Sequence, residues 1–155
     1  MAEKMVFTMG LPASGKSSVI ATKYEPNGYS VIDPDRFKAT HPDYNPKDPD
    51  TTHAWSMDEA EKAFNNALVT GGKWVVDGTG VNAERMLRRI NDAKAVGYTV
   101  TLVYVRVSVD TALVRNAARD RSVPDALIRS KARDIETSFS IVSPHVDSVI
   151  TINND

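Results

Sequence analysis

Short apolar runs alternate with longer stretches of helical periodicity along the whole chain. Five runs are compact, mostly apolar and bounded by turn residues: 5–9, 28–32, 73–76, 99–107 and 148–152. Strands that are apolar throughout are typical of a parallel sheet that helices cover on both faces. We therefore expect five strands in one sheet that is mostly parallel.

Helical patterns fill the intervals between these runs. The segments with this pattern are residues 17–24, 56–69, 82–96, 110–118 and 124–139. Ser56 and Glu59 have the spacing of a capping box at the start of the second segment. Asp110 is expected as the N-cap of the fourth, and Pro124 suits the first turn of the fifth. Residues 38–55, with three prolines, are expected to form a long irregular loop. The order of strands and helices predicts a three-layer α/β fold.

Composition places the chain among globular proteins and excludes several kinds of chemistry. Of its 155 residues, 41% are hydrophobic and 25% are charged, so we expect one packed domain over residues 1–155. The absence of cysteine excludes a disulfide framework, a thiolate metal site and a cysteine nucleophile. No apolar run is long enough for a membrane helix, and no secretory signal opens the chain. A cytoplasmic protein without a membrane partner is therefore expected.

Charge is distributed unevenly, although the net charge is only −1. Residues 41–61 carry six acids and one base, a local net charge of −5, and residues 85–133 carry eleven bases and four acids, a local net charge of +7. The basic region has two interpretations: a surface that faces a phosphate-rich ligand, or solvated helix faces whose charges happen to segregate. Charge alone favours the second interpretation.

A glycine-rich loop follows the first predicted strand. Residues 10–17 read GLPASGKS and match the phosphate-binding pattern GxxxxGK[ST] at each fixed position. The glycines permit backbone angles that turn amide N–H groups toward phosphate oxygens, and the following helix adds the positive end of its dipole. Lys16 would reach the β- and γ-phosphates, and the Ser17 hydroxyl would ligate Mg²⁺. The residues expected to bind the nucleotide are Gly10, Leu11, Pro12, Ala13, Ser14, Gly15, Lys16, Ser17 and Ser18.

Carboxylates follow two further predicted strands. Asp33 and Asp35 come directly after the second strand, and Asp77 closes the third. Side chains just past the carboxyl end of a parallel strand point into the ligand crevice. We expect Asp35 to act as general base on an attacking hydroxyl, and Asp33 either to cap the next segment or to orient Asp35. Asp77 is expected to anchor the Mg²⁺ shell, with contact to the acceptor or a simple turn as alternatives.

An arginine cluster follows the fourth predicted strand. Arg115 and Arg119 have the spacing of one helical face, and Arg121 lies in the short link before Pro124. This arrangement predicts a lid at about residues 115–125. Phosphoryl transfer needs cations on the moving phosphoryl group, so we expect Arg119 to act in catalysis, with Arg115 or Arg121 beside it. The alternative for a bare RxxxR pattern is a solvated helix face.

The histidines carry a weaker signal. His41 and His53 lie in the expected irregular loop and are candidates for contact with the substrate. No pair of histidines has the spacing of metal ligands. A catalytic role for either of them is therefore not the favoured interpretation.

Together these motifs resemble the P-loop kinases of the zeta-toxin and polynucleotide 5′-kinase group. Four segments match in order over nearly the whole chain: GLPASGKSS, IDPDRFKATHPDY, VVDGTGVNAERM and ALVRNAARDRSVPDALIR. The resemblance implies a three-layer P-loop NTPase fold of the kinase type, with a five-stranded, mostly parallel sheet and a helical lid. It also implies ATP and Mg²⁺ as cofactors, in a compact stand-alone enzyme of the phage or bacterial type.

The resemblance implies roles for individual residues. In the polynucleotide kinase pattern, Asp35 falls on the general base and Arg119 on the lid arginine. That family carries an arginine shortly after the base, but here the position is Lys38, with Arg36 two residues earlier. Lysine does not reproduce a bidentate arginine, so this is a departure from the pattern. The residues expected to bind the acceptor are Asp33, Arg36, Lys38, Asp77, Arg85 and Arg121.

The sequence thus predicts a kinase that moves the γ-phosphoryl group of ATP to a hydroxyl of a nucleic acid or nucleotide-like acceptor. DNA is expected in preference to RNA, with the hydroxyl at a 5′ end or on a hydroxymethylated base. The basic region 85–133 would form part of the acceptor groove. One alternative is a small-molecule kinase that acts on a nucleotide sugar or another metabolite. A second is a regulatory P-loop module that binds ATP and hydrolyses it slowly without an acceptor.

Overall fold

The computed structural model describes residues 3–45, 52–119 and 122–155. Five strands form one sheet in the order β2-β3-β1-β4-β5, and every neighbouring pair is parallel. In that order they are Ser30–Ile32, Lys73–Val76, Lys4–Met9, Thr99–Arg106 and Ser148–Asn153. This confirms the expected five-stranded α/β fold. Because the strands are all parallel, the loops that follow β1, β2, β3 and β4 leave the same edge of the sheet.

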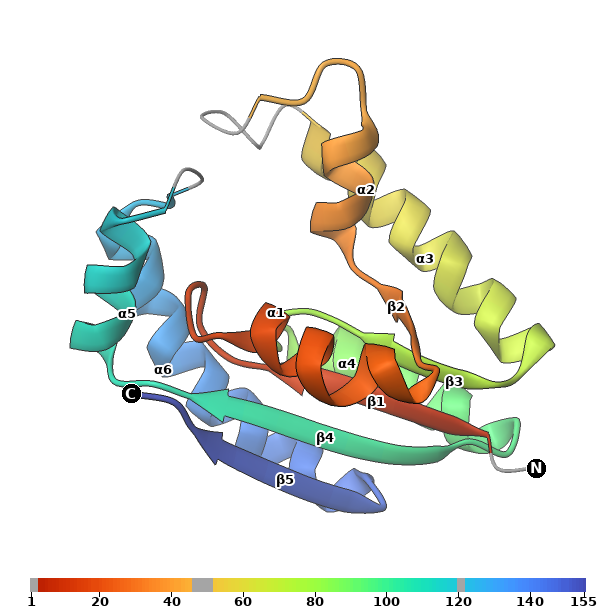
Figure 1. Ribbon diagram of the computed structural model, residues 1–155. Helices are drawn as coiled ribbons and strands as arrows, with labels where there is room; N and C mark the ends of the chain where they lie inside the picture. The colour runs from red at the N-terminus through yellow and green to blue at the C-terminus, as the bar shows by residue number, and fades with distance from the viewer. Residues whose placement is uncertain (1–2, 46–51, 120–121) are drawn as a thin grey trace.

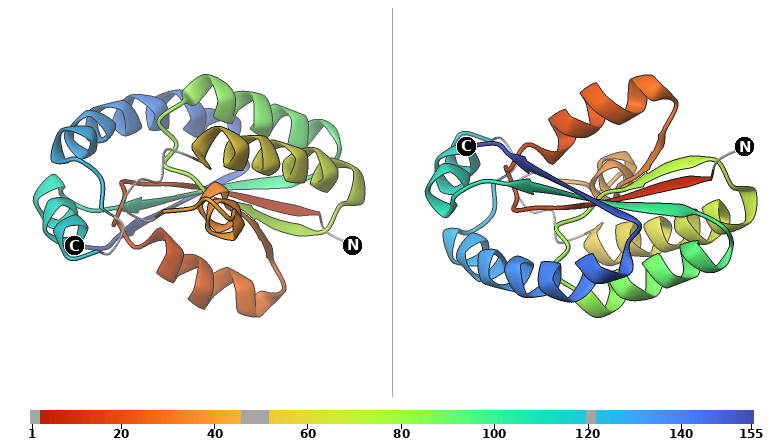
Figure 2. Two further views of the ribbon diagram at one scale, coloured as in Figure 1. Left: turned by 90° about the horizontal axis from the view of Figure 1, so that it is seen from above. Right: turned by 90° about the horizontal axis from the view of Figure 1, so that it is seen from below.

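Helices cover both faces of this sheet (Figure 1). On one face lie α3 (His53–Thr70), α4 (Ala83–Ala95) and α6 (Asp125–Val142), and on the other lie α1 (Lys16–Val19) and the π-helical turn Ile20–Tyr24 that continues it (Figure 2). α2 (Pro34–Thr40) follows β2 and packs against α3. α5 (Val109–Ala117) lies beyond the carboxyl end of β4 and leads into α6.

The core has two parts, one on each face of the sheet. Met5, Phe7 and Met9 of β1 point into the larger part, against α3, α4 and α6. Val6, between them, points into the smaller part and packs with Ile20. A central strand with helices on both faces is apolar at most positions, which explains the mostly apolar run in the sequence.

α4 shows how the sequence determines one of these helices. Asn82 is the N-cap, and its side chain accepts a hydrogen bond from the backbone N–H of Arg85. Met86, Ile90 and Ala93 follow at spacings of four and three, and all three are buried against the sheet. Polar residues occupy the opposite face, so the helix has one buried stripe.

The expected loop over residues 38–55 is shorter than predicted. α2 takes up residues 38–40, because Asp33 caps that helix and Pro34 occupies its first turn. α3 already begins at His53, so it includes residues 53–55. Residues 46–51 of the predicted loop lie outside the described residues.

Two predicted N-caps are wrong. Ser56 lies inside α3, where its buried hydroxyl donates to the carbonyl oxygen of His53 over 2.8 Å, so it forms no capping box with Glu59. α5 is capped by Ser108, whose hydroxyl accepts from the backbone N–H of Thr111, and Asp110 lies in its first turn instead.

Within the described ranges, no helix combines the length and the apolar character needed to cross a membrane.

Tyr98 provides a test of the packing between α3 and the sheet. Its buried hydroxyl donates to the carbonyl oxygen of Ala67 over 2.6 Å, and that oxygen also accepts from the backbone N–H of Gly71. Tyr98→Phe removes one of these two bonds, so we expect the free energy of unfolding to fall by about 1 kcal/mol in a urea titration. Tyr29, whose hydroxyl has no hydrogen-bond partner among the described residues, supplies the control Tyr29→Phe. Equal losses in the two variants would contradict the assignment.

Candidate active site

The loop from Gly10 to Ser17 joins β1 to α1 through backbone angles that most residues adopt only with strain. Gly15, the N-cap of α1, has a φ of 98°, and Ala13 has a φ of 66°. Gly10 passes so close to β4 that a Cβ there would lie 2.5 Å from the carbonyl oxygen of Val105. Glycine at position 10 is therefore required by the neighbouring strand as well as by the turn.

Lys16 is held beneath this loop. Its Nζ donates to the carbonyl oxygens of Gly10 and Leu11 over 2.8 and 3.0 Å. Burial lowers the pKa of its ammonium group to about 8. Within the described residues its hydrogen bonds go only to carbonyl oxygens of the loop, so the ammonium would gain from an anion at the same place.

Four further charged groups act on Lys16 from four separate segments. The carboxylates of Asp77 and Asp35 raise its pKa, and the cations of Lys131 and Arg119 lower it. Asp77 follows β3, Asp35 lies in the first turn of α2, Lys131 belongs to α6, and Arg119 follows α5. The fold therefore gathers four residues that the sequence singled out: Lys16, Asp35, Asp77 and Arg119. It adds Lys131, which the sequence did not single out.

The carboxylate of Asp77 is fixed by the neighbouring strand. The hydroxyl of Thr8, near the end of β1, donates to Oδ1 of Asp77 over 2.5 Å. The backbone N–H of Gly78 in turn donates to the same hydroxyl over 3.1 Å. The pairing of β1 with β3 thus holds Asp77 at the edge where the glycine loop begins.

Asp33 places Asp35 and shares negative charge with Asp77. Its side chain caps α2 by accepting a hydrogen bond from the backbone N–H of Asp35 over 2.8 Å. Burial, and next the carboxylate of Asp77, raise the pKa of Asp33 to about 7. The protein alone therefore does not fully compensate the negative charge of these two carboxylates.

The residues present fit Mg²⁺ when a nucleotide supplies part of its coordination. Ser17 offers an exposed hydroxyl in the first turn of α1, directly after Lys16, and Asp77 offers a carboxylate that acts on Lys16. In the described parts of the chain, no group of three or more His, Cys, Asp or Glu side chains forms a metal site by itself. Mg²⁺ usually binds one or two protein oxygens and completes its shell with phosphates and water. The charge shared by Asp33 and Asp77 favours a cation here.

The two arginines expected in the lid have different environments. Arg119 follows the end of α5 and acts on Lys16, whereas Nη2 of Arg115 donates to the carbonyl oxygen of Asn154 over 2.7 Å. The side-chain amide of Asn154 donates in turn to the carbonyl oxygen of Ser14 in the glycine loop. Arg115 thus contacts the loop through the segment after β5. Arg121 lies outside the described residues.

Arg36 and Lys38, both expected to bind the acceptor, also lie in different environments. Arg36 forms an exposed ion pair with Glu25. Lys38 is buried, with only 2% of its surface exposed, and its Nζ lies 3.2 Å from Nδ1 of His53 and 4.0 Å from Oδ1 of Asp35. Lys38 is therefore a neighbour of the expected general base.

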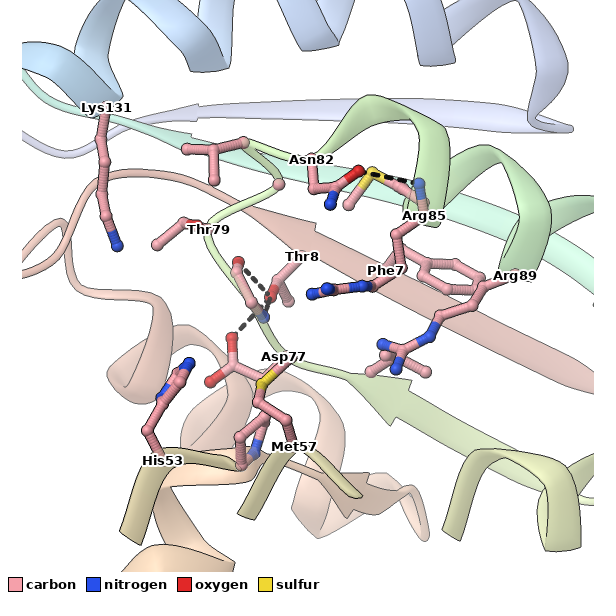
Figure 3. A pocket seen from close by; sticks show the side chains of 16 residues that line it. Phe7, Thr8, His53, Met57, Asp77, Thr79, Asn82, Arg85, Arg89 and Lys131 are labelled. Carbon is pink, nitrogen blue, oxygen red and sulfur yellow. Dashed lines mark hydrogen bonds between the residues drawn. The ribbon is translucent and has the colours of Figure 1, made fainter. Parts of the chain in front are cut away.

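A cavity of about 250 Å³ opens beside Asp77 (Figure 3). Its wall combines apolar side chains of β1, α3 and α4 with the cations Arg85, Arg89 and Lys131. Arg85 reaches from α4 into the cavity toward Thr8, and its guanidinium has no partner among residues 3–45, 52–119 and 122–155. This arrangement favours a ligand with an anionic or electron-rich group.

The basic region 85–133 does not form one continuous cationic surface. Several of its cations are held by partners within the protein: Arg88 and Arg89 by Glu61, Arg106 by Glu136, and Lys94 by the carbonyl oxygen of His145. Arg85 and Lys131 face the cavity, and Arg119 acts at the glycine loop. Nothing in the local sequence distinguished these two classes, because the partners are distant in the chain.

Comparison with known proteins is consistent with this geometry. A family model described as an AAA domain matches residues 5–139. Sequence comparison with curated proteins finds no significant match. Three similar solved structures are a chain of the PezAT chromosomal toxin–antitoxin system of Streptococcus pneumoniae, the AvrRxo1-ORF1:-ORF2 complex with ATP, and a gluconokinase from Sinorhizobium meliloti 1021.

The structural similarity extends over nearly all of this chain. The PezAT chain has a TM-score of 0.81 and 16% identity, with 99% of this chain and 70% of that chain covered. The AvrRxo1 chain has a TM-score of 0.73 and 17% identity, covering 92% of this chain and only 50% of its own. The gluconokinase has a TM-score of 0.63 and 19% identity, covering 98% and 83%. The chain has the fold of these P-loop kinases.

The lowered pKa of Lys16 predicts proton uptake on nucleotide binding. Below about pH 8 the ammonium is charged before and after binding, but at higher pH the free protein has lost the proton that a polyphosphate favours. Affinity for a non-hydrolysable ATP analogue should therefore fall by up to about tenfold per pH unit above that value. Calorimetry at pH 9 in buffers of different ionisation enthalpy should show the uptake, and Lys16→Met should abolish it. Binding without proton exchange would contradict the assignment.

Proposed function

The chain belongs to the AAA domain family, and on that premise we propose that it is an ATP- and Mg²⁺-dependent kinase. It transfers the γ-phosphoryl group to a hydroxyl of an acceptor that occupies the cavity beside Asp77. The observation that carries the proposal is the set of two carboxylates and two cations, from four segments, that act on Lys16. Phosphoryl transfer uses this combination: cations for the moving group and a carboxylate for the attacking hydroxyl.

The donor half of the site binds the phosphates. Bound ATP supplies the phosphoryl group, with Mg²⁺ neutralising part of its charge. The loop amides and Lys16 bind the β- and γ-phosphates, so Nζ exchanges the carbonyl oxygens of Gly10 and Leu11 for phosphate oxygens. Ser17 and Asp77 hold the metal, and Arg119 and Lys131 offset negative charge that develops during transfer.

The acceptor half of the site removes a proton. Asp35 lies at the exposed start of α2, with its side chain half exposed, so an acceptor in the cavity can approach it. Its carboxylate accepts the proton of the attacking hydroxyl as the new P–O bond forms. The ammonium of Lys38 lies 4.0 Å from Oδ1 of this carboxylate.

Two acceptor classes have support from different observations. The cavity volume of about 250 Å³ and its mixed apolar and cationic wall favour a small anionic metabolite or a nucleotide-like acceptor. A nucleic acid is the second class, because Arg85 and Arg88 also line a shallow depression outside the cavity. The end of a nucleic-acid strand could place its hydroxyl in the cavity and its next phosphate groups against Arg85 and Arg88. The internal ion pairs of the basic region favour the small acceptor.

Transfer from γ-labelled ATP tests the assigned base. We expect label on one of three acceptors offered with Mg²⁺: a 5′-hydroxyl oligonucleotide, a duplex with 5-hydroxymethyluracil, or a UDP-sugar. Asp35→Asn should lower kcat by at least about a hundredfold and leave the affinity for ATP nearly unchanged, because the amide accepts no proton. ATP hydrolysis without transfer to any acceptor would favour the regulatory module instead. Undiminished transfer in the variant would show that Asp35 is not the base.

Arg85 tests the acceptor side of the cavity. Arg85→Gln removes a charge-assisted contact, so the KM for the acceptor should rise by about tenfold or more while the KM for ATP stays constant. Arg129→Gln, an exposed arginine of α6 that does not line the cavity, is the matched control and should leave both constants unchanged. A steep increase of the acceptor KM with salt would identify a nucleic acid, and a weak dependence a small molecule. An unchanged acceptor KM in Arg85→Gln would remove Arg85 from the site.

A further inference from the structure

We propose that His53 is an acceptor-binding residue, whose imidazole is held by the buried Lys38 as the tautomer that donates from Nε2. In this role the N–H group at Nε2 donates a hydrogen bond to an oxygen of the acceptor next to the hydroxyl that reacts. Lys38 is then a positioning residue for both His53 and Asp35. The second half of this inference, contact with the acceptor, rests on the function proposed above.

His53 is placed at the wall of the cavity by rigid structure. It is the first residue of α3 and lines the cavity that contains Asp77, and in Figure 3 its ring points into that space. The buried hydroxyl of Ser56 donates to its carbonyl oxygen, which fixes the backbone at this helix start. A side chain on such a helix end has less freedom than one on a loop, so its ring can direct a hydrogen bond.

The contact with Lys38 determines which ring nitrogen carries the proton. Nζ of Lys38 lies 3.2 Å from Nδ1 of His53, and an ammonium group has three donors and no acceptor. Nδ1 must therefore accept this hydrogen bond, and the single proton of the neutral ring resides on Nε2. A proton on Nδ1 would place an N–H group directly against a cation. The position at the start of α3 adds the positive end of the helix dipole and disfavours a second charge.

The burial of Lys38 gives its contact with His53 structural importance. Only 2% of the surface of Lys38 is exposed, so its ammonium depends on partners within the protein. Two of its contacts are with His53 and Asp35, one on the cavity wall and the other the proposed base. One buried cation thus links the group that would take the proton to a group that would hold the acceptor.

The chemistry of this donor differs from that of the cations in the cavity. Arg85, Arg89 and Lys131 recognise negative charge, whereas a neutral imidazole N–H recognises any well-placed oxygen, including a hydroxyl or a carbonyl. His53 therefore contributes orientation of the acceptor rather than attraction of an anion. Its loss should affect the position of the hydroxyl as well as binding.

The tautomer can be measured without any acceptor, by NMR of protein labelled with ¹⁵N at histidine. We expect Nδ1 of His53 to show the shift of an unprotonated nitrogen and Nε2 that of an N–H nitrogen. Lys38→Met should abolish this preference. His41, whose Nδ1 accepts from the backbone N–H of Asp43 over 3.1 Å, is the internal reference and should not change. A proton on Nδ1 of His53 in the native protein would overturn the proposal.

Two replacements of His53 separate its two contacts. His53→Asn keeps an oxygen near Nδ1 for Lys38 but has no donor that reaches the position of Nε2. His53→Gln keeps a donor at the end of the side chain and gives up the contact at Nδ1. With the acceptor that takes up label, His53→Asn should raise the acceptor KM and lower kcat, by about tenfold in kcat/KM, while His53→Gln should retain most of it. The KM for ATP should stay constant in both.

The outcomes distinguish this inference from the proposed function. Equal losses in the two variants, together with a changed KM for ATP or a lower melting temperature, would show a merely structural histidine and overturn the inference. Unchanged kinetics in both variants would overturn it as well. If no acceptor takes up label, the proposed function fails, and the acceptors are then tested for binding by the Nε2 signal of His53. Perturbation of that signal by one of them would support the contact, and the absence of any perturbation would overturn it.

Discussion

The burial of a single ammonium group is the constraint on which the site depends. Lys16 lies under the glycine loop, where its Nζ donates to the carbonyl oxygens of Gly10 and Leu11, and its burial lowers the pKa of the ammonium group. A charge in that position is costly unless opposite charge approaches. The parallel sheet supplies part of this opposite charge, because it brings the carboxylates of Asp77 and Asp35 to the same edge. An anionic ligand would supply the remaining negative charge.

The same edge concentrates negative charge that the protein does not balance by itself. Burial and the carboxylate of Asp77 raise the pKa of Asp33, and the site therefore favours a divalent cation or a proton. Cations and anions thus occur in one small volume without mutual neutralisation. This state is unfavourable for stability and useful for chemistry, since ligands that complete the set of charges are bound strongly.

The features that could be predicted from sequence are those with local causes. The strands and the glycine loop follow from short patterns, and Asp33, Asp35 and Asp77 could be placed because parallel strands end at one edge. Asp110 failed as an N-cap because β4 ends at Arg106 and α5 begins early enough for Ser108 to cap it. The helix α2 was missing from the predicted order, and Ser56 lies four residues after Thr52, the observed N-cap of α3.

Other features depend on tertiary contacts that no local pattern contains. Arg115 and Arg119 were assigned to one helical face, but α5 ends at Ala117, so Arg119 leaves that face and reaches the site alone. Lys131 and Lys94 belong to the same basic region, yet only Lys131 of the two faces the cavity, because Lys94 lies in the last turn of α4 and its Nζ donates to the carbonyl oxygen of His145. The role of Lys38 could not be predicted, because it depends on the contact with His53. That contact exists only because α2 packs against α3.

The hydrogen bond from Asn154 to Ser14 also bears on the order of assembly. It joins residues 140 positions apart and links the loop after β1 to the segment after β5. During synthesis the glycine loop leaves the ribosome among the first residues, whereas this partner leaves after the last strand. The phosphate-binding loop therefore reaches its final contacts only when β5 has joined the sheet, so a nascent chain lacks a finished nucleotide site until that point.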